Sequence, residues 1–174
     1  ALNSRDALDF NGTSNILALA SWPAISAATA FIVCRPNVSP QTDNVLLWRF
    51  GTCSDSSYFA YTGGSHGEIY DGFGTNDRRT ALAPYDLDQQ NNIFETVISA
   101  STCANWLQGA ILMPSAACTV AWNPTPFIGG VNTGQPLNFA GKIVEIVIYG
   151  TALSDQNRSL IRNYLATKWG ATVI

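Results

Sequence analysis

Carboxylate side chains are few in this chain, and their spacing bears on hydrolytic chemistry. Retaining glycoside hydrolysis needs two carboxylates about 5–5.5 Å apart, which alternate positions of one strand would present on one face. The glutamates are Glu68, Glu95 and Glu145, and none has an acidic neighbour two residues away. Glu68 and Asp71 are three residues apart, so on a strand they would point to opposite faces. We therefore expect a protein without enzymatic activity.

His66 is the only histidine and so the only imidazole that could serve as a general base for a serine or cysteine nucleophile. It lies in the glycine-rich stretch 63–67, which is typical of a turn. A single histidine in such a turn is expected to be solvated, so nucleophilic catalysis has no support.

Two acidic loops offer oxygen ligands for Ca²⁺. One carries Asp71, Asn76 and Asp77, and the other carries Asp86 and Asp88. Calcium takes about six to eight oxygen ligands, and neither loop has the spacing of an EF-hand. Aspartate and asparagine are also common turn residues. We predict no cofactor, with a Ca²⁺ site at the first loop as the alternative.

Aromatic residues beside turns are the candidates for contacting a ligand, because aromatic rings stack on the C–H surfaces of sugars and most other aromatic residues lie in cores. The candidate ligand contacts are Tyr70, Phe73, Tyr85, Trp106, Trp122 and the neighbouring Asn123. Trp48 is assigned to the core, because it shares a strand face with Leu46 and Phe50.

Glu145 stands in an apolar run between Val144 and Ile146. A charge in such a strand costs several kcal/mol unless it is paired or hydrogen-bonded. We predict that Glu145 is a structural anchor that accepts hydrogen bonds from a nearby arginine or from loop amides.

Four cysteines stand at positions 34, 53, 103 and 118, and no two form a C-x-x-C pair, so zinc chemistry has no support. Cys34 lies in an apolar run, where a buried thiol behaves as a small hydrophobic group. We expect free thiols, with a Cys103–Cys118 disulfide as the alternative, because these two flank a predicted hairpin.

Length and composition limit the remaining classes. The 174 residues suggest one domain over residues 1–174, and 47% hydrophobic with 12% charged residues excludes a disordered chain. A net charge of −3 without a basic cluster argues against nucleic-acid binding. No apolar run approaches the roughly 18 residues that a membrane span requires.

Short apolar runs separated by turn residues recur along the chain, which favours an all-β sandwich or barrel. The Asn11-Gly12 pair predicts a hairpin between runs 7–10 and 16–19. Further strands are expected at 29–35, 45–50, 58–61, 68–70, 93–99, 106–107, 110–113, 118–122, 127–128 and 142–149.

The last third of the chain predicts a strand followed by one helix. Residues 141–149 are apolar on both faces, as in a strand that is covered on both sides. From residue 155 to 169 the apolar residues recur at helical intervals. Ser154 is a suitable N-cap, and Gly170 stands where a glycine commonly ends a helix.

This C-terminal region resembles the closing segment of laminin-G-like domains of the concanavalin A-like lectin/glucanase superfamily, as found in phage virion and bacterial surface proteins. The matching segments are the strand from Phe139 to Tyr149, the Leu153-Ser154-Asp155 cap and the Lys168-Trp169-Gly170 helix end. The resemblance implies an all-β, concanavalin A-like jelly-roll β-sandwich of two antiparallel sheets with one C-terminal α-helix at about residues 155–169.

The resemblance also implies a non-catalytic recognition or attachment module. It suggests an accessory protein on a phage virion surface, such as a head decoration or a tail or fibre component. The expected partner is a surface glycan or another virion or cell-surface protein. The alternatives are a secreted, extracellular bacterial carbohydrate-binding module and a divergent glycoside hydrolase. The oligomeric state stays open.

Overall fold

The computed structural model describes residues 5–43, 45–53, 57–131 and 137–173. In this part of the chain, twelve strands form two six-stranded antiparallel sheets. One sheet has the order β1-β12-β3-β8-β9-β10, with the bounds Leu8–Asn11, Ala140–Tyr149, Ala27–Pro36, Asn92–Ser99, Thr102–Leu107 and Ala110–Ala117. The other has the order β2-β11-β4-β5-β6-β7, with the bounds Leu17–Ala18, Trp122–Ile128, Leu46–Gly51, Ser57–Tyr61, Glu68–Asp71 and Arg79–Leu82.

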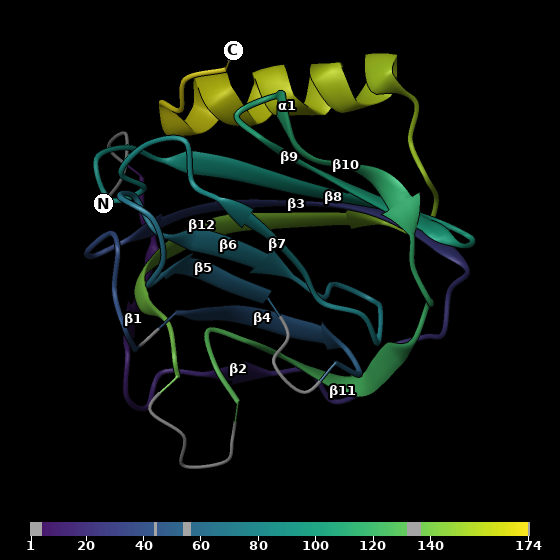
Figure 1. Cartoon of the computed structure of the whole chain (residues 1–174), viewed down its shortest axis with the longest axis horizontal. Coiled ribbons are helices and arrows are strands. Elements are labelled where there is room, and N and C mark those ends of the chain that lie inside the picture. Colours follow the sequence, from purple (N-terminus) through teal and green to yellow (C-terminus); the bar gives the residue numbers. More distant parts are fainter. Residues whose placement is uncertain (1–4, 44, 54–56, 132–136, 174) are drawn as a thin grey trace.

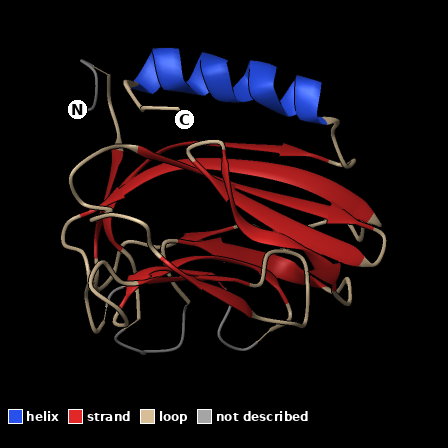
Figure 2. Ribbon diagram, turned by 45° about the horizontal axis from the view of Figure 1, so that its top comes forward, coloured by secondary structure: helices blue, strands red, loops and turns tan. Residues whose placement is uncertain are grey.

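The two sheets stack face to face, and a single helix lies across the outside of one of them (Figures 1 and 2). The predicted jelly-roll sandwich with a C-terminal helix is therefore confirmed. Helix α1 spans Asp155–Trp169. The Ser154 side chain accepts a hydrogen bond from the Asn157 amide, and Gly170 ends the helix with a φ of 65°, which a glycine adopts without strain.

The helix packs on the outer face of the sheet that contains β3, β8 and β12. Leu165 and Trp169 of α1 form a buried apolar cluster with Phe31, Val33 and Ile93 of that sheet. We call it the helix-covered sheet and the other the open sheet, because α1 leaves the outer face of the second sheet uncovered (Figure 2). Burying large apolar side chains stabilises by about 1.5–3 kcal/mol each, so this cluster holds α1 in place.

The interior between the sheets is apolar and rich in aromatic rings. Trp48 and Phe50 of β4 contact Phe73 with ring centroids 4.9 and 5.2 Å apart. Trp48 is fully buried, as predicted. Leu46 does not share its face as expected: a register shift between Leu46 and Trp48 turns Leu46 into a separate cluster outside the open sheet.

A disulfide joins Cys103 of β9 to Cys118, just after β10, whereas Cys34 and Cys53 are free. The expectation of four free thiols is therefore wrong for this pair. The reason is the tight turn at Gln108 and Gly109, both with positive φ, which folds β10 back along β9 and brings the two sulfur atoms together.

The Asn11-Gly12 turn does not form the predicted hairpin. Its flanking strands β1 and β2 belong to different sheets, where they pair with β12 and β11. The Asn11 side chain accepts hydrogen bonds from the amides of residues 13, 14 and 15. The turn is thus a crossing between the two layers. Within the described residues, no helix has the length and apolar composition to span a membrane.

Candidate ligand-binding surface

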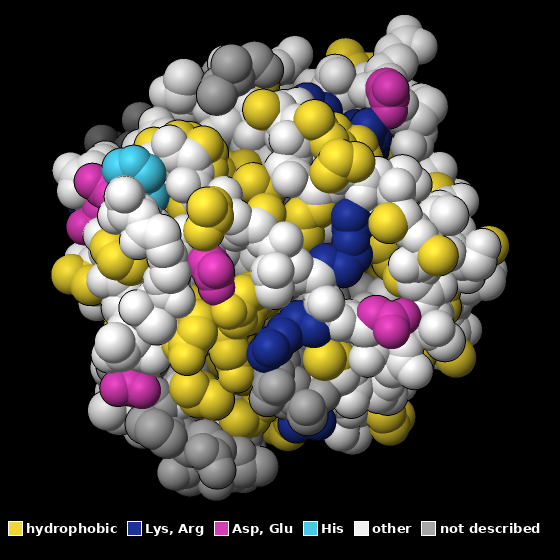
Figure 3. Space-filling model, in the orientation of Figure 1, with side chains coloured by type: hydrophobic (Ala, Val, Ile, Leu, Met, Phe, Trp, Pro, Cys, Tyr) yellow, Lys and Arg dark blue, Asp and Glu magenta, His cyan; other side chains and the backbone are white. Residues whose placement is uncertain are grey.

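Three tyrosines form a contiguous aromatic cluster on the outer face of the open sheet. Tyr58 and Tyr61 lie on β5 and Tyr70 lies on β6, and the ring centroids of each pair are 5.5 Å apart. Tyr58 is buried, while Tyr61 and Tyr70 are half-buried. We call these three residues the tyrosine surface. Figure 3 shows a hydrophobic area over β4–β6, with basic and acidic side chains at its margin.

A β-bulge in β5 explains why two of these tyrosines face outward together. Phe59 and Ala60 both belong to the interior cluster. Ala60 has a φ of 69°, and the pairing register shifts between Phe59 and Tyr61. The extra residue lets Tyr58 and Tyr61 share the outer face although they are three positions apart. In β6, ordinary alternation places Tyr70 between two inward-facing residues.

Charged groups border the tyrosine surface. The Arg78 guanidinium lies 4.6 Å from the ring centroid of Tyr70 and 6.0 Å from that of Tyr58. The Tyr70 hydroxyl donates a hydrogen bond of 2.5 Å to Glu68, which together with partial burial raises the pKa of Tyr70 to about 12. An aromatic area with a cation and a carboxylate at its edges can stack on a sugar ring and hydrogen-bond its hydroxyl groups.

Phe73, Trp122 and Asn123 do not contribute to this surface. Phe73 is fully buried in the sandwich, so its prediction as a ligand contact is wrong. Trp122 packs edge-on against Phe73 at 5.3 Å and donates from its indole nitrogen to the carbonyl oxygen of Ile25. The Asn123 side chain accepts a hydrogen bond from the Thr125 amide within β11.

Tyr85 and Trp106 are held by contacts within the protein. The Tyr85 hydroxyl donates to Asn92 at 3.2 Å, and burial raises the pKa of Tyr85 to about 12. The Arg158 guanidinium of α1 lies 3.8 Å from the ring centroid of Trp106. The guanidinium therefore covers one face of the indole. Of the six predicted ligand contacts, only Tyr70 therefore lies in the tyrosine surface.

The proposed calcium ligand Asp71 points into the sandwich instead of into a loop. Its carboxylate accepts hydrogen bonds from Ser57 (2.9 Å), Phe73 (3.3 Å), Thr96 (3.2 Å) and Asn105 (2.6 Å). Burial raises the pKa of Asp71, and these hydrogen bonds oppose the rise. Thr96 and Asn105 belong to the helix-covered sheet, so Asp71 links the two sheets through polar contacts.

The other predicted metal ligands serve local structure. The Asp77 carboxylate accepts a hydrogen bond from the Thr119 amide at 2.6 Å, and Asn76 is exposed beside it. Asp71 and Asp77 are thus each engaged within the protein, which gives no support to the alternative of a Ca²⁺ site at this loop. In the second acidic loop, Asp86 pairs with His66 at 2.7 Å. No group of three or more metal-ligating His, Cys, Asp or Glu side chains occurs among the described residues.

Glu145 and Glu95 anchor α1 to the helix-covered sheet. Glu145 accepts hydrogen bonds from the Lys168 ammonium at 3.1 Å and from the Trp169 indole. Both donors belong to the helix, not to an arginine or a loop as expected. Glu95 is 1% exposed and forms ion pairs with Arg158 and, at 3.3 Å, with Arg162. No local sequence pattern indicates this second anchor, because its partners are 63 or more positions away.

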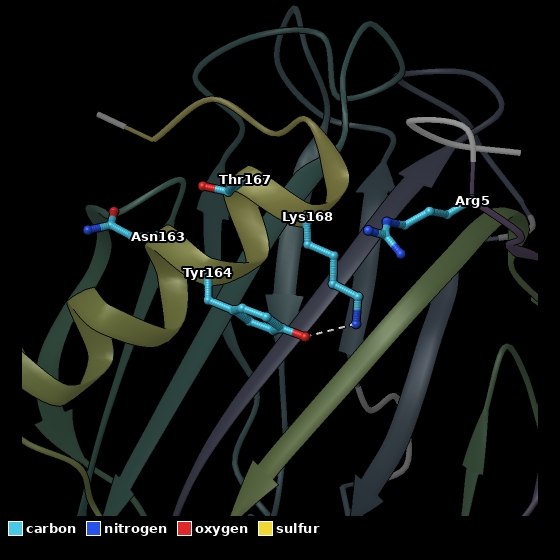
Figure 4. Close-up of a pocket in the computed structure, with 5 residues that line it drawn as sticks. All are labelled: Arg5, Asn163, Tyr164, Thr167 and Lys168. Atoms are coloured by element: carbon cyan, nitrogen blue, oxygen red, sulfur yellow. Dashed lines mark hydrogen bonds between the residues drawn. The ribbon is translucent and has the colours of Figure 1, made fainter.

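A groove lies beside α1 (Figure 4). It is lined by Arg5, Asn163, Tyr164, Thr167 and Lys168. The Lys168 ammonium donates to the Tyr164 hydroxyl at 3.0 Å, and this contact together with Glu145 raises the pKa of Lys168. Because its lysine already helps to anchor the helix, the groove is a weaker candidate than the tyrosine surface.

Tyr58 and Tyr61 belong to the tyrosine surface but were not among the predicted ligand contacts. Strand alternation places residues three apart on opposite faces, so no shared surface is expected without the bulge. The available signal was the density of tyrosines at positions 58, 61 and 70, followed by two arginines at 78 and 79.

The sequence matches no protein-family model and no curated protein. Solved structures do match. A heptameric SAP-like pentraxin from Limulus polyphemus is similar, with a TM-score of 0.65 and 16% identity over 88% of this chain and 80% of that chain. The fold is the concanavalin A-like jelly roll.

Two further structures share this fold. Domain 4 of the extracellular arabinanase AbnA from Geobacillus stearothermophilus, in complex with arabinotriose, gives a TM-score of 0.63 and 14% identity over 90% of this chain and 76% of that chain. The binding domain of botulinum neurotoxin serotype D gives a TM-score of 0.65 and 9% identity over 99% of this chain and 47% of that chain. The predicted concanavalin A-like fold is thus confirmed.

Proposed function

We propose that this protein is a non-catalytic recognition module that binds a glycan through the tyrosine surface. The observation that carries the proposal is the cluster of Tyr58, Tyr61 and Tyr70 on the sheet face that α1 leaves uncovered, with Arg78 and Glu68 beside it. Aromatic rings supply the apolar contact with a sugar ring, and charged groups supply directional hydrogen bonds to its hydroxyls.

The engagement of the glutamates supports a role without catalysis. Hydrolysis of a glycosidic bond needs two facing carboxylates. Glu95 is paired with arginines and Glu145 with Lys168 under the helix, and Glu68 accepts from Tyr70. Each of the three glutamates is therefore paired with a side chain that is not a second carboxylate.

An extracellular location is part of the proposal. The Cys103–Cys118 disulfide supports it, because disulfides persist in oxidising compartments. The fold is also shared with a domain of an extracellular arabinanase whose structure was determined in complex with arabinotriose. Within this setting, we propose a surface-exposed accessory protein of a phage virion, with a secreted bacterial module as the alternative. Mass spectrometry of purified virions would detect the chain in the first case, and its presence only in culture supernatant would contradict it.

A glycan array followed by calorimetry tests the binding function. Tyr70→Ala is expected to weaken binding of the best array glycan by about tenfold or more, because it removes a central aromatic contact. Tyr164→Ala is the matched control, since this tyrosine of α1 is 55% exposed and lies on the other side of the sandwich. If both variants bind the glycan with the same affinity as the unaltered protein, the tyrosine surface is not the binding site.

A further inference from the structure

We infer that the tyrosine surface takes an acidic glycan, one whose sugar carries a carboxylate or a sulfate. This inference rests on the proposed function and names the ligand class of the same site. It comes from two arginines, Arg49 and Arg78, which the strand register places at one end of the tyrosine surface.

Arg49 lies on β4, and its side chain is half-buried. Its Nε is buried and has no hydrogen-bond partner among the described residues. This atom is out of reach of solvent, so an anionic acceptor from outside the chain would meet the other N–H groups of the guanidinium, which share its positive charge.

The strand register brings Arg49 and Arg78 to the same end of the cluster. Leu46 pairs with Tyr58, so Arg49 lies further along β4 beyond the row of Tyr58 and Tyr70. On the opposite flank of the cluster, Tyr70 of β6 pairs with Thr80 of β7. Arg78, two positions before Thr80, therefore also lies beyond the row that Tyr58 and Tyr70 form. The two arginines thus flank one end of the tyrosine surface, Arg49 from β4 and Arg78 from the position just before β7.

Arg78 is exposed and is stacked 4.6 Å from the centroid of the Tyr70 ring. A stacked guanidinium directs its N–H groups within its own plane and away from the ring below it. This geometry suits a carboxylate or sulfate beside a sugar that rests on the tyrosines, because a guanidinium binds such planar or tetrahedral anions through paired N–H···O contacts.

The acidic group of the surface lies at the other end. Glu68 pairs in register with Tyr61 on β5 and with Leu82 on β7, so it borders the end opposite the arginines. Its Oε2 accepts the Tyr70 hydroxyl proton at 2.5 Å. Among the described residues, the arginines and Glu68 thus mark opposite ends of the surface, which would orient a sugar with its anionic group toward Arg49 and Arg78.

Calorimetry with paired probes tests the ligand class. The first pair is an oligogalacturonide and its methyl ester, which differ in charge but share one backbone. The second pair is a sulfated galactan oligosaccharide and its desulfated form. We expect the acidic member of at least one pair to bind with an affinity about tenfold or more above that of its neutral partner. The affinity of the acidic member should fall as the salt concentration is raised. The pair that shows this difference identifies carboxylate or sulfate as the recognised group.

Arginine variants assign the effect to this end of the surface. Arg49→Gln and Arg78→Gln should each reduce acidic-probe affinity and leave the neutral probe unchanged, whereas Arg35→Gln, an exposed arginine of β3, should change neither. Arg78→Gln keeps the test decisive if Arg49→Gln fails to fold. Equal binding of acidic and neutral probes would overturn this inference and leave glycan binding intact. Absence of binding to these probes and to every array glycan would instead refute the proposed function.

Discussion

Replacing Asp71 with alanine should destabilise the sandwich more than replacing any exposed aspartate. The carboxylate accepts from Asn105 at 2.6 Å and from the Phe73 amide at 3.3 Å, and both donors are buried with it. Without the carboxylate these two donors lose an acceptor, at about 1–3 kcal/mol each. The hydroxyls of Ser57 and Thr96 can rotate to other acceptors. Removing the carboxylate also removes the cost of burying it, which offsets part of the cost of the two unpaired donors. We therefore expect a loss of about 3 kcal/mol in the free energy of unfolding.

Urea denaturation followed by tryptophan fluorescence measures this loss. Asp77→Ala is the matched control, because Asp77 is exposed and accepts a hydrogen bond from the backbone amide of Thr119. Its removal should cost less than about 1 kcal/mol. If the two variants differ by less than about 0.5 kcal/mol, the polar link between the sheets contributes little and the reasoning is refuted.

Three further predictions concern separate parts of the fold. Reducing the Cys103–Cys118 disulfide, which closes a loop with a sequence separation of 15, should lower the free energy of unfolding by about 3 kcal/mol. Glu95→Gln should cost about 3–5 kcal/mol in urea denaturation, since it leaves the charge of two buried arginines poorly compensated. In an ultraviolet pH titration, Tyr70 should ionise at about 12, and Glu68→Gln should return its pKa toward the ordinary value of about 10.

Each of these predictions has a control and a contradicting result. Cys53→Ser should leave the effect of reductant unchanged, and an unaltered unfolding midpoint on reduction would contradict the disulfide estimate. Glu68→Gln should cost far less stability than Glu95→Gln, and equal losses would contradict the role of the buried anchor. Because its pKa is raised in the fold, Tyr70 should favour folding below about pH 10 and lose this contribution as the pH passes about 12. Ionisation of Tyr70 near 10 in the unaltered protein would contradict the hydrogen bond to Glu68.

The C-terminal part of the fold was predictable because its signals are local. The N-cap Ser154 and the final Gly170 both act within one helical turn, and they fix the ends of α1. Other features depend on contacts that are distant in sequence. Asn11-Gly12 is a strong turn signal, but which strands it joins depends on partners more than 100 residues away. Strand β7 is absent from the expected strands, because its residues, Arg79–Leu82, lack an apolar alternation.

The candidate surface was less predictable than the fold. Tyr70 was identifiable because it ends an apolar run beside a turn, and regular alternation in β6 turns it outward. Phe73 has the same local context, yet the turn after β6 directs it into the interior. Tyr61 reaches the surface through a bulge at Ala60, whose positive φ has no marker in an alanine. Exposure at turns and bulges follows from backbone geometry that residue types alone do not specify.

Locating a bound glycan tests the central claim most directly. Amide and side-chain chemical shifts, followed by nuclear magnetic resonance during titration with the best-binding glycan, would show which residues it contacts. We predict the largest shifts at Tyr61, Tyr70 and Arg78, on the outer face of the open sheet. Shifts confined to the groove beside α1, at Asn163 and Thr167, or none at all on the tyrosines, would contradict the account.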